Sequence, residues 1–155
     1  MQQIDRRPIP QIPPRWQETA ARALPFLLAV ESATFLLAAL THFSVRLPLG
    51  FATIEEPRIV EATVAEGICC LALGIAAWAL FGRASWAREA ALIATVFSAA
   101  AVVVGIGALR AGRGPRTDLN DVYHPVILVV LLATFALLLL PGVRAALDRT
   151  RDYHN

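Results

Sequence analysis

The sequence contains no lysine, because all 14 of its basic residues are arginine, and charged residues make up only 17% of its 155 positions. An average soluble domain is about 25% charged and roughly 45–50% apolar, whereas 57% of this chain is hydrophobic. This balance excludes an intrinsically disordered protein and fits an ordinary soluble globular protein poorly. The formal net charge of +2 is too small to indicate a nucleic-acid-binding protein.

Residue patterns typical of catalytic and metal sites are also missing. The two cysteines, Cys69 and Cys70, are adjacent, and without a third cysteine they provide neither a zinc site nor an iron–sulfur site. A disulfide between neighbours would be strained, so we expect two small packing residues, with vicinal-thiol redox chemistry as the alternative. No haem-attachment motif, short metal-ligand motif, phosphate-binding loop or dinucleotide fingerprint occurs. The sequence therefore assigns no catalytic residue, no metal ligand and no cofactor.

The chain does contain four long apolar stretches. A bilayer core about 30 Å thick needs roughly 20 mostly apolar helical residues. The stretches at about 24–43, 59–81, 87–109 and 122–140 meet this length. Each is apolar around its whole circumference, unlike a helix with one apolar face. We therefore predict an all-α integral membrane protein, a four-transmembrane-helix antiparallel (up-down) bundle over residues 22–144.

The distribution of arginine predicts the orientation of this bundle. Nine arginines lie in the two tails and the second connection, against five in the first and third connections. Both termini are thus expected in the cytoplasm, with tails at 1–21 and 145–155. The prolines of the N-terminal tail favour an extended or polyproline conformation, either as a loose leader or as a docking arm for a partner. We interpret the first span as retained rather than as a signal peptide, because Glu31 interrupts it.

Local signals predict where the helices begin and pack. Pro57, after the acidic Glu56, predicts the first turn of the second helix. Asp118 or Asn120 is expected to cap the fourth helix, and Pro141 to close it. Small residues that allow helices to approach closely are Gly67, Gly74, Gly105, Gly107 and a stripe of Ala94, Ser98 and Val102 on the third helix.

Three glutamates, Glu31, Glu61 and Glu66, interrupt the apolar spans. Ionisable groups at membrane depth are costly and normally face the interior of a bundle, where they mark function. Arg58 precedes Glu61 by three residues and offers a local ion pair. For Glu66 and Glu31 the alternative to a functional role is a protonated acid bonded to a neighbouring helix. Thr34, one turn from Glu31, is a candidate bonding group.

Two histidines fall at the outer boundary of the predicted bundle, His42 at the end of the first span and His124 just inside the fourth. These two helices are neighbours in an up-down bundle. We predict one outward-facing ligand-binding pocket formed by His42, Glu61, Glu66, Asp121 and His124. Such a set suits a metal ion, a proton relay or a quinone headgroup. The alternatives are ordinary interfacial hydrogen bonds of the two histidines, or a structural cluster neutralised by Arg58 and Arg116.

The sequence thus predicts a small multi-pass protein of a bacterial-type inner membrane that binds a small ligand, a proton or a cation through this pocket. Its number of spans resembles that of the DoxX-like membrane proteins, which are associated with quinone redox chemistry. No motif of that family matches residue by residue, so the resemblance carries over no site. A quinone-linked redox subunit and a purely structural or assembly subunit are the alternatives. The expected partners are the lipid bilayer and a membrane protein or second copy of the chain, without nucleic acid.

Overall fold

The computed structural model describes residues 14–48, 50, 53–54 and 56–152, so most of the proline-rich segment lies outside the described residues. The described chain forms five helices and one short antiparallel pair of strands. In chain order these elements are α1 (Arg15–His42), β1 (Leu47–Pro48), β2 (Thr53–Ile54), α2 (Val60–Phe81), α3 (Ala87–Arg110), α4 (Asp118–Leu139) and α5 (Pro141–Asp152).

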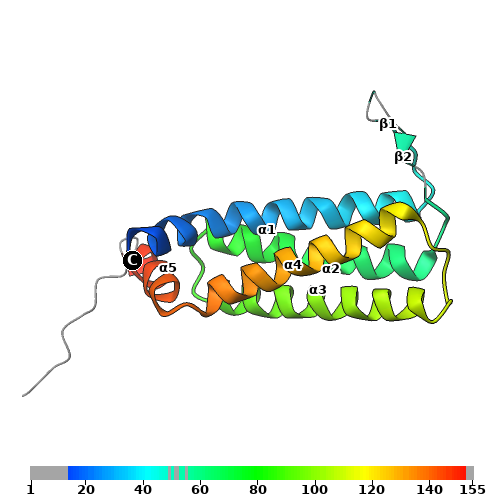
Figure 1. Ribbon diagram of the computed structural model, residues 1–155. Coiled ribbons are helices and arrows are strands. Elements are labelled where there is room, and N and C mark those ends of the chain that lie inside the picture. The colour runs from blue at the N-terminus through cyan, green and yellow to red at the C-terminus, as the bar shows by residue number, and fades with distance from the viewer. Residues whose placement is uncertain (1–13, 49, 51–52, 55, 153–155) are drawn as a thin grey trace, which may run out of the picture.

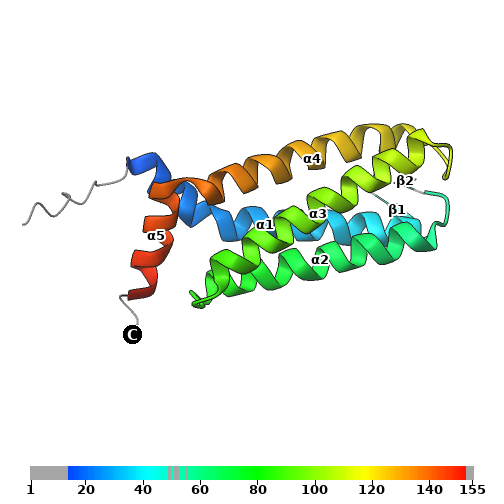
Figure 2. The ribbon, with the colours of Figure 1, turned by 90° about the horizontal axis from the view of Figure 1, so that it is seen from below.

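Helices α1 to α4 lie side by side along one long axis, and the chain reverses direction at each connection between them (Figures 1 and 2). The short strands lie near the end where α1 finishes and α4 begins, called the His42 end below. Helix α5 lies across the opposite end, next to the start of α1, and this is called the terminal end (Figure 2). Both ends of the described chain are therefore at the terminal end.

Each of the four long helices is long and apolar enough to cross a membrane, which confirms the predicted all-helical chain with four candidate spans. Helices α2 and α3 match their predicted bounds to within one residue. Helix α1 begins earlier than its apolar stretch, at Arg15, so part of the predicted tail is helical and Pro25 lies inside the helix. The apolar pattern marks only the part of α1 that suits a bilayer, and the helix continues beyond it.

Of the two sequence expectations about the ends of α4, the one for its cap is wrong and the one for its end at Pro141 is confirmed. Thr117 caps α4 in place of Asp118 or Asn120, and its side chain accepts a hydrogen bond from the backbone N–H of Asn120 at 3.2 Å. Pro141 also begins α5, a helix that the apolar stretches do not predict. Proline suits the first position of a helix because no intrahelical partner is needed for its missing N–H.

Helices α1, α2 and α3 all end in the same way. The second residue after each helix has a left-handed backbone, at Ser44 (φ 71°), Arg83 (φ 55°) and Gly112 (φ 70°). The amide of the next residue then bonds a carbonyl in the last turn, as from Val45 to Leu40 at 3.0 Å. Glycine is favoured at this position because it lacks a Cβ. Ser44 and Arg83 therefore hold a conformation that is sterically unfavourable for their type.

Close packing of α1 on α2 depends on small side chains. A Cβ at Gly74 would lie only 3.1 Å from Ser32 Oγ, and Ser32 donates a 2.8 Å hydrogen bond to the backbone carbonyl of Cys70. Gly105 similarly faces the ring of His124, whereas a Cβ at Gly67 or Gly107 would meet nothing within 4 Å. The predicted small stripe of α3 is buried at Ala94, Ser98 and Val102.

Candidate functional site

A buried pair formed by His42 and Glu66 lies at the His42 end. His42 is the last residue of α1 and is only 3% exposed, and its Nε2 lies 3.7 Å from Glu66 Oε1 on α2. Its Nδ1 faces the carbonyl of Pro57 at 3.4 Å. A carbonyl oxygen only accepts, so this contact places a hydrogen on Nδ1 and leaves Nε2 facing the carboxyl group. One proton, on either Nε2 or Glu66, makes the two facing groups complementary.

Two buried polar atoms in and beside this pair have no hydrogen-bond partner among the described residues. They are Glu66 Oε2 and the hydroxyl of Tyr123 on α4. Tyr123 is close enough to Glu66 for the two to interact electrostatically. The side chain of Thr34 approaches the Tyr123 hydroxyl without forming a well-directed hydrogen bond, since Thr34 donates to the carbonyl of Glu31. A buried polar group without a partner costs about 1–3 kcal/mol. These two atoms are therefore where the site has unused capacity to bind a polar group.

Glu56 connects the segment between α1 and α2 to the start of α4. It is buried, and its Oε2 accepts hydrogen bonds from Thr117 Oγ1 at 2.8 Å and from Asn120 Nδ2 at 3.4 Å. The prediction that Pro57 lies in the first turn of the second helix is wrong, because α2 begins at Val60. Glu56 is thus not at the positive end of α2 but fastens the loop onto α4.

A cavity of about 360 Å³ opens between α1 and α4 beside these residues. Its size falls within the range of small-molecule sites, about 300–1,000 Å³. Most of its wall is apolar, and its polar groups are few. It is lined by Thr34, Leu37, Ala38, Thr41, His42, Pro48, Ile54, Glu56, Leu119, Asn120 and Tyr123.

His124 and Asp121 lie at a different cavity, of about 230 Å³, between α3 and α4. His124 Nδ1 is 2.9 Å from the backbone carbonyl of Asn120, and its Nε2 would be 3.6 Å from a Cβ at Gly105. Asp121 is exposed and forms a two-pronged contact with Arg116, at 3.0 and 3.2 Å. Arg116 therefore neutralises an acid at this second cavity.

The structure thus brings together two of the five predicted site residues, His42 and Glu66. His124 and Asp121 line the second cavity, and Glu61 is exposed. Arg58, the expected ion-pair partner of Glu61, lies over the ring of Phe43, 5.5 Å from its centroid. The single five-residue pocket is divided because His124 turns toward α3 rather than toward α1.

Sequence reasoning missed Glu56, Asn120 and Tyr123 as members of the site. Asn120 was expected to cap the fourth helix, and a tyrosine near a helix end is typical of the membrane interface. For Asn120, the helical periodicity of the fourth span could have predicted its burial. Asn120 precedes Ile127 by two turns, and both are on the buried face of α4.

A second buried acid, Glu31, lies deeper in the bundle. It is 1% exposed, and the Thr134 hydroxyl on α4 lies 2.5 Å from its Oε1. The expected partner Thr34 instead donates to the backbone carbonyl of Glu31 at 2.7 Å. Hydroxyls on helices commonly bond a carbonyl in the preceding turn, which explains why proximity in sequence misled here. Glu31 therefore fastens α1 to α4.

The described residues offer little further evidence of redox chemistry or metal binding. Cys69 and Cys70 are free thiols. Within the described ranges, no three His, Cys, Asp or Glu side chains gather closely enough to hold a metal ion. No protein-family model matches the chain, and no curated protein or solved structure is detectably similar to it. Its function is therefore argued from the geometry of the site.

Proposed function

We propose that α1 to α4 cross a bilayer as an up-down antiparallel bundle, in a bacterial-type inner membrane. The support is the outward-facing apolar surface of the helices. Leu71, Ile93 and Val104 are 66%, 70% and 71% exposed, on α2 and α3. Extended apolar surfaces of this kind are rare on soluble monomers. Lipid chains would cover them without further protein.

In the proposed orientation both termini are cytoplasmic and the His42 end faces outward. The arginine bias supports this orientation, and tryptophans mark an interface without saying which side of the membrane it faces. Trp78 and Trp86 lie with their ring centroids 6.3 Å apart, where α2 leads into α3. In a Cys69→Ala/Cys70→Ala background, an impermeant thiol reagent added outside should label Asp118→Cys but not Arg149→Cys. The reverse labelling would place the His42 end in the cytoplasm.

The cavity between α1 and α4 binds a small molecule that has an apolar body and one hydrogen-bonding end group. The observation that carries this proposal is the buried, unpartnered hydroxyl of Tyr123, which lines an apolar cavity together with His42. Glu66, whose Oε2 is also unpartnered, does not line the cavity and lies behind His42, 3.7 Å from its Nε2. The end group would accept a hydrogen bond from Tyr123. His42, which lines the cavity and faces Glu66, would be a second polar contact for the end group. A quinone headgroup has this chemistry, since its carbonyl oxygens accept hydrogen bonds and take up protons on reduction.

A short-chain ubiquinone analogue added to the detergent-purified chain tests this proposal by equilibrium binding. Tyr123→Phe should weaken binding roughly tenfold, for a lost hydrogen bond of about 1–1.5 kcal/mol, and His42→Ala should weaken it further. His124→Ala is the matched control, since it removes a histidine from the neighbouring cavity. Equal weakening by His124→Ala would assign the ligand to the α3–α4 cavity instead.

A structural or assembly subunit is the second candidate, and the contact between Glu31 and Thr134 favours it. In that case the buried acids only fasten helices together. His42→Ala and Glu66→Gln would then lower the stability of the purified chain, and the wild type would bind no quinone analogue. An association with a membrane protein or with a second copy of the chain also stays a prediction.

A further inference from the structure

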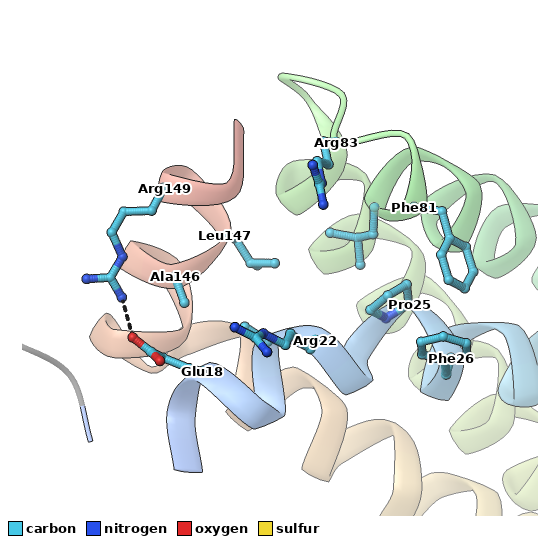
Figure 3. Close-up of a pocket in the computed structure, with 11 residues that line it drawn as sticks. Glu18, Arg22, Pro25, Phe26, Phe81, Arg83, Ala146, Leu147 and Arg149 are labelled. Carbon is cyan, nitrogen blue, oxygen red and sulfur yellow. Dashed lines mark hydrogen bonds and ion pairs between the residues drawn. The ribbon is translucent and has the colours of Figure 1, made fainter. Parts of the chain in front are cut away.

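A second large cavity, of about 430 Å³, lies at the terminal end, remote from the His42 site. Its walls are the first turns of α1, the last turn of α2 and one face of α5 (Figure 3). Helix α5 forms its wall because Val143 and Ala146 are buried against the bundle, while Arg144 and Asp148 face outward. A helix with one apolar and one charged face that lies across the end of a bundle is typical of a membrane interface.

The cavity has an excess of positive charge. Arg22, Arg83 and Arg149 line it, and Glu18 is the one acid among its lining residues. Glu18 bonds Arg149 at 3.0 Å, in a pair that is half exposed and therefore weak. Arg22 has no ion-pair partner in the part of the chain that the structure describes. Arg22 is therefore a guanidinium that a bound anion can pair without displacing an acid.

Arg83 lines the cavity although its backbone conformation is sterically unfavourable for a residue with a Cβ. It has the left-handed conformation, φ 55°, at the end of α2, although the adjacent Gly82 would suit that conformation better. The same left-handed ending closes α1 and α3, and here it fixes the direction in which the Arg83 side chain leaves the end of α2. In Figure 3 the side chains of Arg83 and Arg22 extend into the space between the helices.

The deeper part of the cavity is apolar. Pro25, Phe26 and Phe81 line it, and the two phenylalanine rings meet edge to face with centroids 5.0 Å apart. Phe26 and Phe81 are also 63% and 50% exposed, so they continue the apolar surface of the bundle. The cavity therefore combines cationic groups at its mouth with an apolar wall that leads along the helices.

We propose that this cavity binds the phosphate headgroup of an anionic phospholipid, with the acyl chains lying along Phe26 and Phe81. Planar guanidinium groups match phosphate oxygens in a two-pronged geometry, and basic pockets on the cytoplasmic side of membrane proteins suit such headgroups. Inorganic phosphate shares the charge but not the acyl chains, so the apolar wall favours the lipid. The inference rests on the proposed membrane insertion but not on the ligand of the His42 site.

Native mass spectrometry of the full-length chain in detergent tests the proposal. Phosphatidylglycerol and phosphatidylcholine with identical acyl chains are added together, and retention of the first is expected. Arg22→Gln and Arg83→Gly should each lower its affinity about fivefold, as expected for the loss of one basic residue at a lipid headgroup. Arg83→Gly relieves the unfavourable backbone, so a loss of binding in this variant does not reflect misfolding. Arg113→Gln is the matched control, because it removes the same charge at the His42 end.

Three results would overturn the proposal. One is equal retention of the two lipids by the wild type, and another is an equal loss of affinity in Arg113→Gln. The third is displacement of bound phosphatidylglycerol by an equal concentration of inorganic phosphate, which would show recognition of the free anion. The thiol-labelling experiment measures insertion separately, so a failed headgroup preference and a failed insertion are distinguishable.

Discussion

The contact between Glu31 and Thr134 offers a quantitative prediction about what holds the bundle together. Both side chains are buried, and Glu31 Oε2 has no hydrogen-bond partner among the described residues. Replacing Thr134 by valine keeps the shape and leaves both carboxyl oxygens without a partner. Hydrogen bonds between membrane helices contribute about 0.6 kcal/mol on average and about 1.7 kcal/mol at most. Because nothing else compensates, we expect Thr134→Val to cost about 1.5 kcal/mol.

The number of hydrogens available between Glu31 and Thr134 makes the prediction for this contact more specific. The Thr134 hydroxyl lies 2.5 Å from Glu31 Oε1 and 3.1 Å from the carbonyl of Val130. It has one hydrogen, so it donates to one of these acceptors at a time. A neutral Glu31 satisfies both contacts by donating to Thr134, which in turn donates to Val130. The amide of Glu31→Gln can donate in the same way, so this variant is expected to be close to wild type.

Reversible unfolding in mixed micelles of mild detergent and dodecyl sulfate measures these free energies. A double-mutant cycle of Glu31→Leu and Thr134→Val should give a coupling of about 1 kcal/mol. The carbonyl infrared spectrum should contain a protonated-acid band that Glu31→Gln removes. Additive effects in the cycle, or a Glu31→Gln variant as unstable as Thr134→Val, would show that the acid is not fastened in this way.

Three further predictions concern packing and helix ends. Gly74→Val should destabilise the protein by roughly 1–3 kcal/mol through overpacking, whereas Gly107→Val, in open space, should have little effect in the same unfolding assay. Ser44→Gly should stabilise it by about 1 kcal/mol, since glycine suits the left-handed conformation, and an unchanged or lower stability would contradict this. Thr117→Val should release Glu56 and speed hydrogen exchange at the start of α4, with α3 as the internal reference; unchanged exchange would show that Glu56 does not hold α4.

The sequence was sufficient for the elements but not for their side-chain partners. Long apolar runs specify membrane-length helices directly, and α2 and α3 match them almost to the residue. Which way a polar residue near a helix end turns depends on the rotation of the helix, which an evenly apolar span does not reveal. His124 turned toward α3 for this reason, and Asn120 turned inward.

Contacts between residues far apart in the sequence could not be predicted from the sequence either. Glu56 lies 64 residues from Asn120, and no local pattern links a loop acid to the start of a later helix. Helix α5 was missed because Pro141 was interpreted only as a stop signal. The left-handed helix endings at Ser44 and Arg83 could not be predicted, because neither residue is the glycine that usually marks such an ending.

The position of Glu31 and Thr134 in the chain also has a consequence for biosynthesis. The two residues are 103 positions apart, and a ribosome adds roughly 5–20 residues per second. Glu31 on α1 therefore lacks its hydrogen-bond partner for roughly 5–20 s, until Thr134 on α4 is synthesised. In the proposed bilayer insertion, a nascent chain that stalls before α4 would expose a polar group at membrane depth, which is costly in lipid. Completion of the fourth helix would supply the hydrogen bond that Glu31 lacks until then.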